Sequence, residues 1–240
     1  MGVMQEIRTG TWRLAASLIL AGVLASIFAG VFHAESHDAN DHVASFTAYA
    51  NSGIWTAVHL GQFLGMALVC AGLVSLWSAS GAQRHAMTWI ARFGALAAAA
   101  ALALYAALQA VDGVALKQAV DAWAAAPEPE KAARFATAEG IRWLEWGMRS
   151  YHSFLLGAAL VLLGVVVVAM HRVPRIIGLL MALSGMGYLA QGWIIGETGF
   201  SGANSVPTLV AIVAIVAASV WLFITAVRMK DTTTAAAHPR

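Results

Sequence analysis

The sequence predicts an all-α protein whose helices cross a lipid bilayer six times. Of the 240 residues, 60% are hydrophobic and only 11% are charged, whereas about a quarter of a typical soluble domain is charged. The apolar residues fall into six runs that are long enough to span a membrane as helices, and most charges lie between those runs. Backbone groups in lipid must be bonded within the protein, so these spans are expected to be helices in a polytopic bundle.

Each span is an apolar run between polar segments. The first run is longer than the core of a signal peptide, which is about 7–15 residues, so we interpret it as a retained helix. Pro127 and Pro129, each followed by an acid, predict a helix start, and this helix could continue into the fourth span. Residues 1–230 are predicted to form one transmembrane domain, and the polar residues 231–240 a disordered tail. The six spans are residues 14–32, 54–77, 89–111, 147–170, 176–195 and 208–227.

Six spans place both termini on one side of the membrane. Basic residues are usually enriched in cytoplasmic loops. Apart from the long loop between the third and fourth spans, most basic residues lie on the same side of the membrane as the N-terminus. Both termini are therefore predicted to be cytoplasmic. These residues are Arg8, Arg13, Arg84, Arg92, Arg172, Arg175, Arg228 and Lys230.

A charged stripe leads into the fourth span. Its members are three or four positions apart, which places them on one side of a helix. Lipid does not tolerate such a stripe, so we expect it to face other helices or water held between them. The stripe consists of Glu139, Arg142, Glu145, Arg149 and His152.

The predicted topology brings polar side chains from five helices to the same outer level. Each buried polar group needs a partner or water, so the pattern predicts a polar cavity that opens outward. These groups are His33 on the first helix, His59 and Gln62 on the second, Gln109 and Asp112 on the third, Glu145, Arg149 and His152 on the fourth, and Gln191 and Glu197 on the fifth.

One interpretation of these groups is purely structural. Glu145 is three positions from Arg142 and four from Arg149, which suits ion pairs along a helix. Asp112 could also meet Arg149 across the bundle. Such pairs would orient helices without any ligand, as in a structural or accessory subunit of a membrane complex.

A second interpretation is a metal site. His33 and His37 are four apart, close to Glu35 and to further acids. Histidine with carboxylate suits zinc, or copper if nitrogen dominates. We predict His33, His59 and His152 as metal ligands. The catalytic candidates are Asp112 as a ligand or base, Glu145, and Arg149 as a group that binds an anion or orients Glu145; the cofactor-binding candidates are Gln62, Gln109 and Trp143.

An open zinc position could activate water, so a membrane-embedded metal-dependent hydrolase is one expected function. Haem ligated by His59 and His152 is a less favoured alternative. Tryptophans such as Trp143 could line a haem pocket, but tryptophans are expected at the membrane interface in any case, so they do not indicate one. Proton-coupled transport through Asp112 or Glu145 is another alternative. The sequence leaves open whether the protein is an enzyme.

The segments 108–117 and 142–149 resemble those of a group of uncharacterised bacterial integral membrane proteins of about this length. The resemblance implies a multi-pass protein of the bacterial plasma membrane and brings no activity with it. The expected partners are the lipid bilayer, a small-molecule or lipid substrate and a membrane-protein partner. No nucleic-acid motif is present.

Overall fold

The computed structural model describes residues 2–33, 38–80 and 85–229. The predictions for Glu35, His37 and the tail 231–240 therefore lie outside the described residues. Within them the fold is helical and contains no strand, so the predicted all-α class is confirmed. The elements are α1 (Gly2–Val31), α2 (His42–Asn51), α3 (Trp55–Ser80), α4 (His85–Ala110), a π-helix η1 (Val111–Leu116), α5 (Lys117–Ala124), α6 (Glu128–Met170), α7 (Arg175–Thr198), a 3-10 helix η2 (Gly202–Asn204) and α8 (Ser205–Arg228).

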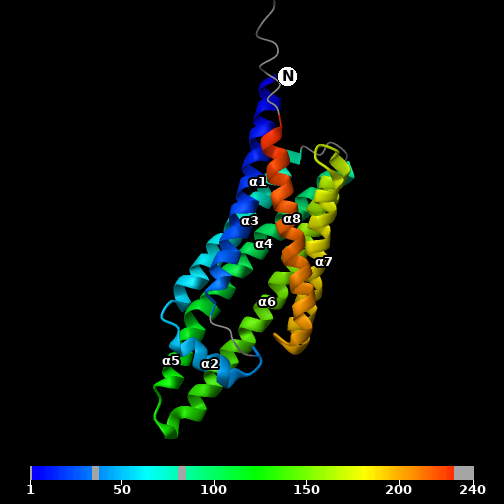
Figure 1. Ribbon diagram of the computed structural model, residues 1–240. Coiled ribbons are helices and arrows are strands. Elements are labelled where there is room, and N and C mark those ends of the chain that lie inside the picture. The colour runs from blue at the N-terminus through cyan, green and yellow to red at the C-terminus, as the bar shows by residue number, and fades with distance from the viewer. Residues whose placement is uncertain (1, 34–37, 81–84, 230–240) are drawn as a thin grey trace, which may run out of the picture.

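Six of these helical segments are long and apolar enough to cross a membrane, as the sequence predicted (Figure 1). Lengths of this kind imply a lipid bilayer environment. The segments are Thr9–Val31, Trp55–Ala79, Ala86–Ala124, Glu128–Met170, Arg175–Thr198 and Gly202–Arg228.

The third and fourth spanning segments extend beyond a single membrane crossing. Helix α6 has 43 residues, which corresponds to about 65 Å at the usual rise per residue, against about 30 Å for the hydrocarbon core. Pro127 and Pro129 precede or open its first turn, where a missing N–H costs nothing. The projecting part of α6 packs against α5 and α2 around a small aromatic core that includes Phe46, Tyr49 and Trp55.

Helix α2 lies within the polar segment that follows the first span. Asp41 caps it, because the Asp41 side chain accepts a hydrogen bond from the backbone N–H of Ala44. Phe46 and Tyr49 are completely buried on one face of α2. The segment was expected only to be polar; the helix forms because these two aromatic side chains bury their rings against α5 and α6.

Helices α1 and α8 meet near the two ends of the chain. The Arg13 side chain donates hydrogen bonds to the backbone oxygens of Ala226, at 3.4 Å, and Met229, at 2.6 Å. From this contact the two helices diverge toward the opposite end of the bundle (Figure 1). Both described chain ends therefore lie at the same end of the molecule.

Helices α6 and α7 approach each other through glycines. A Cβ atom on Gly185 would lie 2.6 Å from the backbone oxygen of Gly157, and one on Gly178 would lie 2.5 Å from that of Gly164. Real Cβ atoms do not approach backbone so closely, so these positions require glycine. Small residues at helix contacts are the usual means of close packing inside membranes.

Candidate metal centre

Three side chains from separate elements converge toward the end of the bundle opposite the termini. His33 follows the end of α1, His59 lies near the start of α3, and Asp112 lies in η1. One ligand atom from each lies within 4.8 Å of the other two. His59 is 1% exposed and Asp112 8%. A group of this composition and spacing could hold a metal ion.

The hydrogen bonds of His59 define which ring nitrogen carries hydrogen. Its Nδ1 lies 2.8 Å from the backbone oxygen of Trp55, which can only accept, so Nδ1 is the donor. Its Nε2 lies 2.9 Å from Oδ2 of Asp112. In a neutral imidazole this Nε2 has a lone pair that faces a carboxylate, so the contact needs a cation or an added proton. Metal-bound histidines typically donate their other N–H to a carbonyl in this way.

The π-helix presents Asp112 to His59. The indole Nε1 of Trp55 donates to the backbone oxygen of Asp112 at 2.9 Å, and the Thr56 hydroxyl donates to that of Gly113 at 3.0 Å. Side chains of α3 thus satisfy two carbonyls of η1. A Cβ on Gly113 would lie 2.6 Å from Cβ of His59, so glycine allows this approach. Short π-helices are rare and frequently occur at functional sites.

Aromatic rings surround the two histidines. The centroid of Trp55 lies 4.4 Å from that of His59 and 4.9 Å from that of His33. The ring centroid of Tyr49 lies 4.1 Å from that of Trp55. These contacts restrict how the imidazole rings can rotate and so hold their nitrogens toward Asp112.

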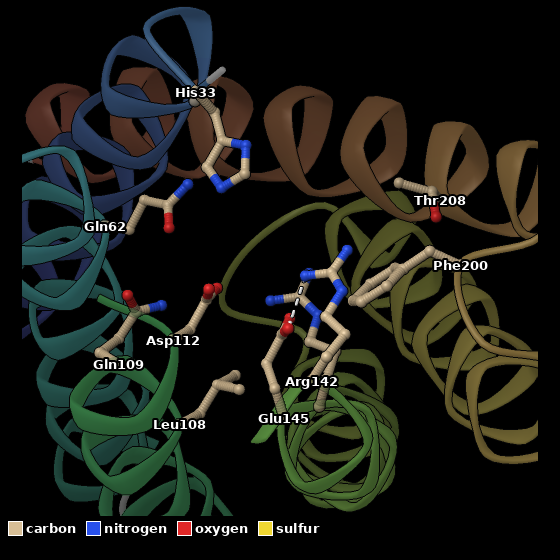
Figure 2. A pocket seen from close by; sticks show the side chains of 11 residues that line it. His33, Gln62, Leu108, Gln109, Asp112, Arg142, Glu145, Phe200 and Thr208 are labelled. Atoms are coloured by element: carbon tan, nitrogen blue, oxygen red, sulfur yellow. Dashed lines mark hydrogen bonds and ion pairs between the residues drawn. The ribbon is translucent and has the colours of Figure 1, made fainter. Parts of the chain in front are cut away.

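A polar cavity of about 480 Å³ adjoins this group. Figure 2 shows its side chains pointing inward from several helices, with Asp112 and Glu145 opposite each other. A ligand bound in this cavity would have to suit the side-chain amides, the two carboxylates and the two guanidinium groups that line it. The lining residues are Gly30, His33, Gln62, Leu108, Gln109, Asp112, Arg142, Glu145, Arg149, Phe200 and Thr208.

The two arginines of the cavity differ in their partners. Arg142 forms a buried ion pair with Glu145, and its guanidinium lies 5.0 Å from the ring centroid of Phe200 (Figure 2). It is one of the pairs expected along the charged stripe; the expected pairs of Arg149 with Glu145 and with Asp112 do not occur among the described residues. Arg149 makes no ion pair within residues 2–33, 38–80 and 85–229, and lies beside the hydroxyls of Tyr105 and Tyr188.

A second cavity, of about 490 Å³, shares Gly30, Gln62 and Arg149 with the first. Its other lining is mostly apolar. His152 lies here, with its Nδ1 3.0 Å from the backbone oxygen of Ala101. The remaining lining residues are Val23, Ser26, Ile27, Val31, Met66, Val69, Tyr105, Leu156, Leu160, Tyr188, Ile212 and Ile215.

The structure thus separates the residues that the sequence proposed for one site. His33, His59 and Asp112 come together, and Gln62, Gln109, Glu145 and Arg149 line the polar cavity beside them. His152 is in the apolar cavity and is not part of the His/Asp group. Trp143 is 57% exposed and lines neither cavity.

Other residues of the site were not anticipated. Tyr49, Thr56, Gly113 and Phe200 contact its functional groups, but nothing in the sequence pattern marks them. Gly113 carries the one usable signal, because a glycine directly after an acid at the end of a span suggests close approach of another backbone or side chain. Its partner, His59, could not be inferred from that signal alone.

The model of one protein family, described as a domain of unknown function (DUF4386), matches residues 14–226. The match covers most of the chain, which therefore belongs to this family. It agrees with the resemblance to uncharacterised membrane proteins. The searches of curated proteins and of solved structures found no significant match.

Proposed function

We propose that this member of the DUF4386 family binds a divalent cation, in the first instance zinc, through His33, His59 and Asp112. The observation that supports it is the position of His59, whose Nδ1 is committed to a carbonyl while Nε2 faces the Asp112 carboxylate at 2.9 Å. Two nitrogens and one oxygen are a common zinc ligand set, and copper is the alternative that nitrogen ligands favour.

The same donor set supports a membrane-embedded hydrolase. Three protein ligands beside an open cavity are typical of catalytic zinc sites. A zinc ion with an open coordination position acidifies water and polarises carbonyl or phosphoryl oxygens. Glu145, held in the cavity by Arg142, would accept a proton from the attacking water. Arg149 would bind an anionic part of the substrate, and the amides of Gln62 and Gln109 would orient uncharged groups.

The proposal includes an orientation in the membrane. The cavity would open at the outer face of the bacterial plasma membrane, with both termini in the cytoplasm. The distribution of basic residues supports this orientation.

A second candidate is an accessory membrane protein without a metal. The 2.9 Å contact of His59 with Asp112 equally fits an imidazolium–carboxylate pair. Together with the Arg142–Glu145 pair it would orient α3, η1 and α6 without chemistry. Such a protein should co-purify with a membrane partner and tolerate loss of Glu145.

Metal analysis of the purified protein separates the two candidates. We expect about one zinc per chain in the wild type, and at least a tenfold lower content in His59→Ala and in Asp112→Asn, which keeps the shape of the side chain. His152→Ala is the matched control, because His152 is equally buried, also binds a backbone carbonyl and lies outside the group.

Equal metal content in all four preparations would overturn the metal site. Size-exclusion elution and helix content would show that each variant is folded. If the analysis finds copper in place of zinc, the identity of the bound ion changes and the proposed ligands stay the same. A visible haem absorption band would overturn the zinc assignment and support the haem alternative. Hydrolysis of ester or phosphoester substrates that is lost in Glu145→Gln would support the enzyme.

A further inference from the structure

We infer that the two adjoining cavities together bind an anionic membrane lipid, with its headgroup beside Arg149 and its acyl chain in the apolar cavity between α1 and α8. This inference rests on the proposed function in one respect: it names the class of ligand that the metal group would meet. The residues that hold the lipid are otherwise separate from His33, His59 and Asp112.

The apolar cavity has the size and surface for a hydrocarbon chain. Its volume of about 490 Å³ lies in the range of about 300–1,000 Å³ that ligand sites usually have. Aliphatic side chains from α1, α3, α6 and α8 form most of its wall, among them Val23, Val69, Leu160 and Ile215. Contact with these groups favours a hydrocarbon chain over a hydrated polar solute.

The cavity reaches the surface that faces lipid. Ile27 and Val31 of α1 line it and are also 41% and 75% exposed, and Ile212 of α8 lines it and is 39% exposed. These residues lie on the two helices that diverge from their contact at Arg13 (Figure 1). A lipid chain could therefore enter sideways from the bilayer, without passing through water.

Charge at the junction of the cavities determines the headgroup. Arg149 lines both cavities, and its Nε is buried and has no hydrogen-bond partner. Neither nearby carboxylate pairs with Arg149 in the described residues: Glu145 pairs with Arg142, and Oδ2 of Asp112 pairs with His59 while its Oδ1 has no hydrogen-bond partner. A guanidinium at membrane depth needs an anion, and phosphate is the anion that its fork of donors fits best.

Two further polar atoms in the apolar cavity suit the linker region of a lipid. Nε2 of His152 and Oγ of Ser26 are buried and have no hydrogen-bond partner. His152 is 1% exposed, and because its Nδ1 is the donor to Ala101, its Nε2 is an acceptor. A lipid hydroxyl could donate to His152, and the Ser26 hydroxyl could donate to an ester oxygen. A plain hydrocarbon would leave both atoms unsatisfied.

Lipid titration of the purified protein, followed by native mass spectrometry, tests this site. The probes are dioleoyl phosphatidylglycerol, which is anionic, dioleoyl phosphatidylcholine, which has no net charge, and glycerol phosphate, which lacks acyl chains. We expect the wild type to bind phosphatidylglycerol at least tenfold more tightly than phosphatidylcholine, and glycerol phosphate at least a hundredfold more weakly than phosphatidylglycerol.

Matched variants assign the binding to the two ends of the site. Arg149→Gln should lose the preference for phosphatidylglycerol. Gly30→Phe should weaken both lipids at least tenfold, because Gly30 lines both cavities and a Cβ there meets nothing within 4 Å. Gly10→Phe is the control, since Gly10 is also on α1, has equally open space and lies outside the cavities.

Equal affinity for the two lipids in the wild type, or an unchanged preference in Arg149→Gln, would overturn the inference. Glycerol phosphate that binds as tightly as phosphatidylglycerol would also overturn the inference, because the acyl chains would then contribute nothing to binding. Zinc content measured on the same samples separates the proposals: loss of lipid selectivity with zinc retained overturns only the lipid site, and lipid binding without zinc overturns only the metal site.

Discussion

A single residue, Trp55, contacts every member of the candidate metal centre. Its ring packs on both histidines, and its indole N–H binds the backbone oxygen of Asp112. The residue is 1% exposed, so this hydrogen bond is shielded from water. Trp55 therefore holds both the π-helix and the imidazole rings in place.

We expect Trp55→Phe to destabilise the protein. Phenylalanine keeps an aromatic ring against His59 but removes the donor, which leaves a buried carbonyl unsatisfied at a cost of about 1–3 kcal/mol. Unfolding of the purified protein by heat or by sodium dodecyl sulfate would measure this loss of stability. Trp143→Phe is the control, because Trp143 is 57% exposed. Equal loss in both variants would show that the Trp55 hydrogen bond contributes little.

Among the contacts between elements, that of α6 with α7 depends on glycines that leave no room for a side chain. The Cβ of a residue at 185 would lie 2.6 Å from the backbone oxygen of Gly157 and 2.7 Å from a methyl carbon of Val161. Neither helix can yield locally, because the clash involves backbone. The two helices would have to separate along much of their length.

Gly185→Val should therefore lower the free energy of unfolding by at least about 1–3 kcal/mol, the usual cost of overpacking a core. The expected result is a lower melting temperature, or loss of the monodisperse peak in size-exclusion chromatography. Gly147→Ala on α6 is the control, since a Cβ there meets nothing within 4 Å. A melting temperature for Gly185→Val that matches this control would contradict the close approach.

For the whole molecule, the proposed orientation makes a prediction that is independent of the site. Arg13, Arg92, Arg175 and Arg228 all belong to the end of the bundle that holds the termini. We expect green fluorescent protein fused to the C-terminus to fluoresce in bacterial cells. Alkaline phosphatase inserted after Ala126 should be active, because that enzyme folds only outside the cytoplasm. The reverse pattern would place the cavity on the cytoplasmic side.

The sequence predicts the membrane fold far better than the site. Apolar runs identify the spans, because a run of that length has few alternatives to a buried helix. The convergence of His33, His59 and Asp112 also follows in part from topology, since all three lie at helix ends on the side opposite the termini. Which of them touch depends on how each helix is rotated, and η1 changes that rotation within the third span.

The charged stripe shows why spacing alone is insufficient. Thirteen positions separate Glu139 from His152, which is about 20 Å along a helix and more than one small cavity can contain. The stripe is therefore divided along its length: Glu139 lies 2.9 Å from His42 of α2, Glu145 lines the polar cavity, and His152 lines the apolar one. Spacing identified the shared face but not the depth of each residue.

The π-helix also has a consequence for comparing members of this family. A π-turn accommodates one more residue than an ordinary turn, so a chain one residue shorter within 111–116 could wind as a regular α-helix from His85 to Ala124. Leu116 and Val120 would still reach the small aromatic core that includes Phe46 and Tyr49. Such a shorter relative would retain the architecture while its aspartate pointed elsewhere. Chain length in this one turn is thus a criterion for deciding which homologues share the chemistry and which share only the scaffold.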